Sequence, residues 1–249
     1  MISFNVITPF PEMFNNILNE SILLKAKQKK IAEYNIFNLF DFLDNPSERI
    51  DDYPFGGGPG MLMKSEPIFK AVDKIKSNIK SSNDCRIIFP TPDGKVFNHD
   101  KAKNLSNVKN LIFICGHYKG IDQRIRDEIV TDEISIGDFV LTSGELPSMI
   151  MIDSIVRLKK GVLNNYESAE KDSFYDLLLD GPHFTRPREF RGNKVPDVLL
   201  SGNHKEIEDW FLNKREEKTK KLRIDLWKKY KSKKMEQKWI KFMNLLKII

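Results

Sequence analysis

Three apolar runs in the middle of the chain each lead directly into a loop rich in glycine and proline. The pairs of run and loop are residues 85–89 with 90–94, 110–115 with 116–120, and 132–136 with 137–144. Segments of helical character separate the runs, and strands that alternate with helices predict a mainly parallel α/β sheet. Ligands of such sheets bind outside the carboxyl ends of the strands. We therefore expect the three loops to hold one ligand through backbone groups, unless each is an ordinary strand-to-helix turn.

The N-terminal part of the chain continues this alternation. Residues 2–8 and 34–40 have the β-branched or alternating character of strands, and the apolar positions of residues 12–29 recur at helical intervals. Ser65 opens a further helix with a proline in its first turn, where proline is tolerated. The pattern predicts a last helix of this part over residues 144–158.

A bare stretch, FGGGPGM at residues 55–61, is incompatible with a helix or a regular strand. A phosphate-binding P-loop would end in Gly-Lys-Ser/Thr, whereas here Met61 follows Gly60. Met61 also stands where the dinucleotide-binding pattern requires its last glycine. The residues by themselves leave open whether this is a surface turn or a loop with a binding role.

Size and composition suit one large domain or two smaller ones. The chain has 249 residues, of which 40% are hydrophobic and 31% are charged. Its apolar runs fall short of the roughly 18 residues that span a bilayer, and its two cysteines, Cys85 and Cys115, lie in apolar runs. These features predict a cytoplasmic protein with buried thiols and no membrane partner. The four histidines lack the spacing of metal ligands, so no metal site is predicted.

Positive charge is concentrated at the C-terminal end. Residues 205–249 contain 15 Lys and Arg against 7 Asp and Glu, a balance of +8, so the 204 residues before them carry −2 of the overall +6. This asymmetry favours a polyanion such as a nucleic acid as partner, the alternative being a solvated helical surface. We expect most of the interleaved aromatic residues in the core of a small helical domain and a minority to stack on bases. They are Trp210, Phe211, Trp227, Tyr230, Trp239 and Phe242.

Five stretches of the chain form a distinctive combination. They are DDYPFGGGPGM (51–61), CGHYKGID (115–122), DEISIGDFVLTSGELP (132–147), GPHFTRP (181–187) and LLSGNH (199–204). In this order they resemble the TrmD family, the bacterial tRNA (guanine-N1)-methyltransferases of the SPOUT class, over nearly the whole chain. The resemblance implies a trefoil-knotted α/β domain and a homodimer with its active site at the subunit interface. It also implies methyl transfer from S-adenosylmethionine to N1 of the guanosine just 3′ of the tRNA anticodon.

The polar segment 164–173 divides the chain into two parts. It lacks apolar periodicity and predicts a linker or loop between domains. With the resemblance, it predicts a SPOUT methyltransferase domain in residues 1–163 and a basic helical tRNA-binding domain in residues 174–249. The resemblance also makes FGGGPGM a loop that passes close to the bound base, the cofactor or a partner subunit.

By position, the resemblance places the cofactor in three knot loops, at about residues 89–94, 115–120 and 136–147. The residues it assigns to the cofactor are Phe89, Pro90, Thr91, Gly116, Tyr118, Gly120, Ile136, Gly137, Asp138, Phe139, Val140, Leu141, Gly144 and Pro147. These loops coincide with those grouped above from the strand ends. No metal is assigned, and a requirement for Mg²⁺ is not readable from the sequence.

The resemblance assigns catalysis to Arg157 and Asp172. Guanine N1 carries a proton at neutral pH, so a carboxylate that removes it makes the nitrogen nucleophilic, an effect of about 10²–10⁴-fold. Negative charge then builds on guanine O6, where a guanidinium stabilises it. Each residue also has a structural interpretation. Arg157 lies four residues after Asp153 and could form a surface ion pair with it, and Asp172 could cap a helix that begins at Ser173.

Four positions depart from the family pattern. Lys119 stands where an acidic residue is expected, His117 where arginine is common, Ser143 for a usual glycine and Gly181 for a usual cysteine. The reversed charge at Lys119 puts details of the second loop in doubt. Two alternatives stay open, a SPOUT enzyme of ribosomal RNA and a non-catalytic RNA-binding protein on the same scaffold. The presence of both catalytic candidates favours an enzyme, and the basic C-terminal part with GPHFTRP favours tRNA.

Overall fold

The structure, a computed structural model, describes residues 1–79, 84–163 and 172–245. The chain forms two compact units, Met1–Tyr166 and Glu167–Ile249, which we call the sheet unit and the helical unit. Most of the predicted linker lies outside the described residues. Among the helices that the structure describes, none combines the length and the apolar character needed to cross a membrane.

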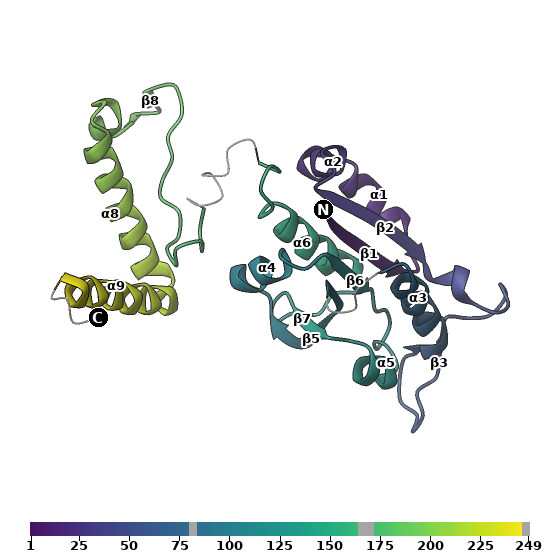
Figure 1. The fold of residues 1–249 in the computed structure, drawn as a ribbon. Coiled ribbons are helices and arrows are strands. Elements are labelled where there is room, and N and C mark those ends of the chain that lie inside the picture. The colour runs from purple at the N-terminus through teal and green to yellow at the C-terminus, as the bar shows by residue number, and fades with distance from the viewer. Residues whose placement is uncertain (80–83, 164–171, 246–249) are drawn as a thin grey trace. The chain divides into compact units, whose positions relative to one another are not determined.

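The sheet unit is built on five parallel strands in the order β2–β1–β6–β5–β7 (Figure 1). Their bounds are Ile2–Thr8 for β1, Ala32–Asn38 for β2, Cys85–Val96 for β5, Asn110–Ile114 for β6 and Asp132–Ser135 for β7. β5 pairs with both β6 and β7 in parallel, so the three strands that precede the special loops are neighbours. The predicted parallel α/β sheet is confirmed.

Helices cover both faces of this sheet and bury two cores. One face carries α1 (Glu12–Leu18), α2 (Ser21–Gln28), α4 (His99–Leu105) and α6 (Glu145–Val156); the other carries α3 (Ser65–Ser77), α5 (Gln123–Glu128) and a 3₁₀ helix (Leu39–Phe42). In β1, Phe4 and Val6 belong to the first core and Ile7 to the second. Burial on both faces explains why the strands are continuous apolar runs in the sequence.

β5 is longer than the strand expected at residues 85–89. It pairs with β7 up to Pro90, loses its register, and resumes pairing at Lys95. Pro90 and Pro92 lack the N–H groups that a continuous ladder needs, so the chain bulges out between them and Lys95. A Cβ at Gly94 would lie 2.5 Å from the backbone nitrogen of Ile134, so only glycine allows the strand to return this closely.

The stretch 12–29 forms two helices instead of the single one expected. α1 ends at Leu18 and α2 begins at Ser21. Asn19 has non-helical backbone angles, φ −103° and ψ 20°, and Ser21 has a positive φ of 48°. Both helices bury their apolar residues in the same core, and the helical spacing of the sequence therefore did not reveal the break.

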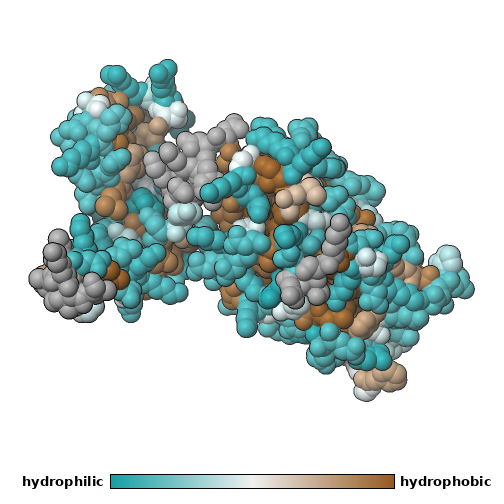
Figure 2. Space-filling model, in the orientation of Figure 1, coloured by the Kyte–Doolittle hydropathy of each residue, from teal (hydrophilic) through white to brown (hydrophobic). Residues whose placement is uncertain are grey.

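The helical unit contains two long helices, α8 and α9, with a short hairpin before them. Its elements are β8 (Glu189–Phe190), β9 (Asn193–Lys194), a 3₁₀ helix (Asp197–Leu200), α8 (His204–Leu222) and α9 (Ile224–Leu245). In the described part of this unit, the buried side chains are Leu178, Thr219 and Leu226. Most of the six aromatic residues were expected in a core. Trp210, Phe211, Trp227 and Tyr230 are half-buried, whereas Trp239 and Phe242 are exposed. Hydrophobic residues appear at the surface of this unit among hydrophilic ones (Figure 2).

Two very short strands complete the sheet unit. β3 (Asp51–Asp52) and β4 (Leu62–Met63) pair in antiparallel fashion on either side of the glycine stretch. Met63 also forms a bridge with Ile121, which follows the second special loop. The glycine stretch is thus anchored at its base, close to the carboxyl ends of the sheet strands.

Candidate functional site

The three predicted loops meet around one cavity, the first as the bulge inside β5 and the other two at the carboxyl ends of β6 and β7. The empty space between the loops, with the open solvent at its mouth included, is about 690 Å³. Thirteen of the fourteen residues assigned to the cofactor line it, and Asp138 does not. The sequence assignment had not included seven further lining residues, although all lie in or beside the same loops. They are Pro92, His117, Lys119, Ile134, Ser135, Thr142 and Ser143.

Glycines allow the loops to touch. The N–H of Gly144 donates a hydrogen bond to the carbonyl of Gly116, with 2.9 Å between N and O. A Cβ at Gly144 would lie 2.7 Å from the nitrogen of Gly116 and 2.8 Å from Cα of Cys115, both rigid backbone atoms. A Cβ at Gly116 would lie 2.7 Å from the ring of Phe89, on the first loop. The close contact of the loops therefore depends on glycine at residues 116 and 144.

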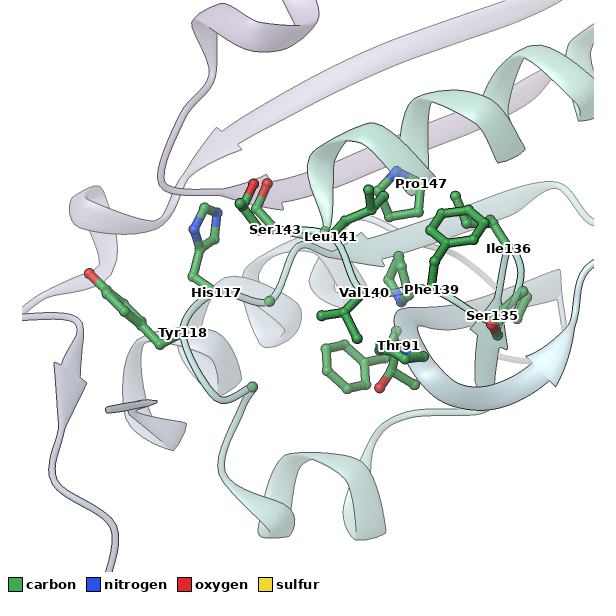
Figure 3. A pocket seen from close by; sticks show the side chains of 18 of the residues that line it. Thr91, His117, Tyr118, Ser135, Ile136, Phe139, Val140, Leu141, Ser143 and Pro147 are labelled. Carbon is green, nitrogen blue, oxygen red and sulfur yellow. The ribbon is translucent and has the colours of Figure 1, made fainter. Parts of the chain in front are cut away.

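The cavity wall combines apolar side chains with exposed backbone. Phe139 and Val140 are 53% and 81% exposed, although both are apolar. Figure 3 shows Thr91, Val140 and Leu141 around the hollow, with the ring of Tyr118 pointing away from them. This arrangement suits a ligand with a flat apolar ring, whose polar edges find backbone N–H and C=O groups.

A buried carboxylate lies behind the cavity, in the first turn of α6. The Glu145 side chain is fully buried, and its Oε1 lies 2.8 Å from Nε2 of His117 and accepts a 2.6 Å hydrogen bond from Thr8. Burial disfavours the charged carboxylate, but hydrogen bonds from His117, Thr8 and Ser143 outweigh it and lower the pKa of Glu145. His117 and Ser143 also form a bridge between their loops. His117 and Ser143, which both depart from the family pattern, thus contact the same carboxylate.

The glycine stretch packs beside the second loop. The N–H of Lys119 donates to the carbonyl of Met61, with 3.0 Å between N and O. A Cβ at Gly60 would lie 2.8 Å from Cγ of Lys119, so the lysine stem crosses the bare backbone there. The preceding Phe55 side chain is fully exposed. The structure therefore places the stretch next to the cavity. Lys119, which departs from the family pattern, lies between them.

The two catalytic candidates belong to different units, and neither lines the cavity. Arg157 is the C-cap of α6 and is half-buried, and Asp172 is half-buried as well. Both make side-chain or electrostatic contacts. Residues 173–176 form turns, so no helix begins at Ser173 that Asp172 could cap. Among the residues described, no three His, Cys, Asp or Glu side chains gather as metal ligands would.

The fold and cavity define an α/β protein with a hollow between backbone loops at the carboxyl edge of a parallel sheet. A family model narrows this class, because the tRNA (guanine-1)-methyltransferase model, TrmD, matches residues 2–229. The chain belongs to the TrmD family and is a tRNA (guanine-N1)-methyltransferase. This family uses S-adenosylmethionine as methyl donor and methylates guanosine 37 of tRNA.

Individual relatives match this chain over nearly their whole length. The tRNA (guanine-N(1)-)-methyltransferase of Clostridioides difficile is 53% identical over 226 residues, which are 91% of this chain and 97% of the relative. The proteins of the same name from Anoxybacillus flavithermus and Alkaliphilus metalliredigens are each 49% identical. Those matches cover 95% and 94% of this chain, and 96% and 95% of the relatives. The resemblance seen in five motifs therefore extends through both units.

Proposed function

We propose that the cavity of the sheet unit binds S-adenosylmethionine. One observation carries this proposal. Three loops converge on one hollow, and thirteen of the fourteen residues assigned to the cofactor line it. The residues fit the group: Phe139 and Val140 offer exposed apolar surface to its adenine ring, and the loop backbones offer hydrogen bonds to its polar edges. At Gly120, which has a φ of +125°, a Cβ would meet no atom within 4 Å and would project into open space. When bound, the cofactor supplies a methyl group on a positively charged sulfur.

The chain's own residues contribute two things to the reaction. They remove a proton from guanine and stabilise the negative charge that results. We assign Asp172 as the general base that takes the proton from N1, which frees the nitrogen lone pair for attack. Arg157 then stabilises the negative charge that builds on O6. The support is positional, because both residues are present where the family pattern has its catalytic pair. No metal ligand is required by this scheme.

The assembly is also part of the proposal. A homodimer would bring Arg157 and Asp172 of different subunits to one site, and it would cover the exposed side chains of Tyr53 and Phe55 beside the glycine stretch. The trefoil knot of the SPOUT class is supported by the family match over residues 2–229. The +8 balance of residues 205–249 supports the helical unit as the main tRNA-binding part, in a cytoplasmic enzyme.

One assay tests the function. The full chain is incubated with methyl-labelled S-adenosylmethionine and unmodified tRNA, and the tRNA is digested to nucleosides. We expect the label in 1-methylguanosine from position 37, and none of it when guanosine 37 is replaced by adenosine. Label found on a 2′-hydroxyl, or only on added ribosomal RNA, would contradict the proposal. Retained tRNA binding without any transfer would support the non-catalytic alternative.

A further inference from the structure

The wall of the cavity contains very few groups that can carry a charge. Of the twenty described residues that line it, His117 and Lys119 are the two whose side chains can be charged near neutral pH. His117 already has a partner, since its Nε2 lies 2.8 Å from Oε1 of the buried Glu145. Lys119 therefore carries the charge of this wall that is open to a ligand.

A second cation beside the cavity also has its partners within the protein. The guanidinium of Arg126 lies 5.6 Å from the centre of the Phe89 ring, on the first loop. Its nitrogens lie 2.7 Å from a carboxylate oxygen of Asp93 and 2.6 Å from one of Glu133. By contrast, within the part of the chain that the structure describes, no acidic side chain pairs with the ammonium of Lys119.

The glycine stretch holds this lysine in place. The backbone of Lys119 is bonded to Met61, and its Cγ lies over Gly60, where an added Cβ would come within 2.8 Å of it. Gly60 has a φ of +95°, a conformation that favours glycine. The stem thus packs against bare backbone beside the cavity, while the side chain as a whole stays exposed.

The proposed place of the adenine ring decides which end of the cofactor meets this lysine. Phe139 and Val140 of the third loop offer their apolar surface to the ring. Figure 3 shows His117 and Tyr118 of the second loop on the opposite side of the hollow from Phe139. With the ring against the third loop, the amino-acid end of S-adenosylmethionine extends toward the second loop. That end carries the carboxylate, the one negative charge of the cofactor.

We propose that Lys119 binds the carboxylate of S-adenosylmethionine and makes the cavity select ligands that carry this group. An ammonium donates a strong, charge-assisted hydrogen bond to a carboxylate. A tRNA phosphate is the competing anion, but Lys119 lines the same hollow as the residues assigned to the adenine ring, which favours the carboxylate. This inference rests on the proposed function, because it requires the cavity to hold this cofactor. It gives the departure at residue 119 a role in ligand selection.

The test measures ligand selection by calorimetric titration, with no methyl transfer involved. Dissociation constants are determined for S-adenosylmethionine and for decarboxylated S-adenosylmethionine, which keeps the adenosine, the sulfonium and the amine. Their ratio is compared between the wild-type chain, Lys119→Gln, which removes the charge, and Lys119→Arg, which keeps it. The matched control is Lys95→Gln. Lys95 is an exposed lysine where β5 resumes its pairing, and it does not line the cavity.

We expect the wild-type chain to bind S-adenosylmethionine about tenfold or more tightly than the decarboxylated analogue, as one hydrogen bond between charged groups provides. Lys119→Gln should lose about tenfold in affinity for S-adenosylmethionine and none for the analogue. Lys119→Arg and Lys95→Gln should keep most of the wild-type ratio. S-adenosylhomocysteine has the carboxylate but no charge on sulfur, and it should lose as much affinity in Lys119→Gln as the cofactor does.

A ratio that is the same in the wild-type chain and in Lys119→Gln would overturn the inference. If tRNA binding weakens in Lys119→Gln while the ratio stays unchanged, the lysine belongs to a tRNA phosphate. A salt titration of the wild-type chain needs no variant. The ratio should fall as ionic strength rises, because salt screens an exposed charge pair, and a constant ratio would also overturn the inference. A wild-type chain that binds none of the three ligands would instead contradict the proposed function itself.

Discussion

The two units of the molecule bury their side chains to very different degrees. In the sheet unit, Phe4 and Phe113 are fully buried, and two cores fill both faces of the sheet. In the described part of the helical unit, the buried side chains are those of Leu178, Thr219 and Leu226, while Trp239 and Phe242 are exposed. A close-packed scaffold holds its loops in fixed positions, which a small cofactor requires. A loosely packed, basic surface suits a large polyanion, which binds through many exposed contacts.

The largest predicted effect comes from one added methyl group where the loops of the sheet unit touch. We predict that Gly144→Ala abolishes detectable binding of S-adenosylmethionine, a loss of more than about 10²-fold, because its Cβ would collide with the backbone of Gly116 and Cys115. Binding of tRNA by the helical unit should be retained. Calorimetric titration with the cofactor and filter binding with tRNA measure the two separately.

Gly116→Ala serves as a matched control for that substitution. Its Cβ would approach the far edge of the Phe89 ring, a side chain that can turn, instead of rigid backbone. The backbone of neither glycine has a positive φ, so conformational strain is the same small factor in both variants. We expect a weaker loss of cofactor affinity than in Gly144→Ala. An equal or greater loss of cofactor affinity in Gly116→Ala would contradict the account of how the loops are held.

The second prediction concerns the proposed catalytic pair, whose members belong to different units. Arg157→Ala and Asp172→Ala should each lose about 10²-fold or more in the transfer rate. In verified mixed dimers of the two variant chains, one of the two sites regains both residues, so activity should return to about half the wild-type level. Unmixed variants provide the baseline. Mixed dimers that stay inactive would place both residues in the same chain's site, or remove one from catalysis.

Sequence reasoning was most successful where a single physical rule governs a segment. Burial on both faces accounts for the apolar runs of the sheet strands, and the glycine- and proline-rich loops at residues 90–94, 116–120 and 137–144 indicated the cavity. The break between α1 and α2 was missed because both helices face one core. The buried network around Glu145 was also missed, because its partners Thr8 and His117 are distant in sequence and meet only when β1 and the loop after β6 are neighbours.

The helical unit was harder to predict. Aromatic residues are usually buried, so most of the six in residues 205–249, a set that includes Trp239 and Phe242, were expected in a core. Two crossing helices do not enclose enough volume to cover them, and the structure leaves both exposed. The sequence gives composition and helical spacing but not how many neighbours each helix has. The roles of Arg157 and Asp172 came from the family pattern, since spacing along the chain cannot place residues of two units in one site.

The smallest predicted effect compares two carboxylates whose pKa is about 2, one in each unit. Burial of Asp132 raises its pKa, but hydrogen bonds from Arg86, Lys101 and Thr131 outweigh this and lower it to about 2. Its folded pKa lies below the unfolded value, so the stabilisation is present above about pH 4 and is lost as the pH falls toward 2. We predict that Asp132→Asn costs about 2 kcal/mol of stability at neutral pH, a difference that shrinks below about pH 3.

Asp225 in the helical unit is the control for that prediction. A hydrogen bond and charge from Arg223 lower its pKa to about 2, yet this pair is exposed to solvent. Exposed ion pairs contribute little to stability, so Asp225→Asn should leave thermal unfolding nearly unchanged at any pH. Thermal unfolding of both variants is measured by circular dichroism at a series of acidic pH values. A larger effect at Asp225 than at Asp132 would reverse the comparison between the units.

The proposed division of work, with the cofactor in the sheet unit and the base in the helical unit, is tested most directly by Asp172→Asn. Asparagine keeps the shape of the side chain but cannot accept the N1 proton. Single-turnover transfer rates are measured at saturating tRNA and S-adenosylmethionine from about pH 6 to 9. We predict a rate about 10²-fold lower near neutral pH, partial recovery at the alkaline end, where more guanine N1 ionises unaided, and unchanged cofactor binding and melting temperature. A wild-type rate for Asp172→Asn at neutral pH would contradict the account.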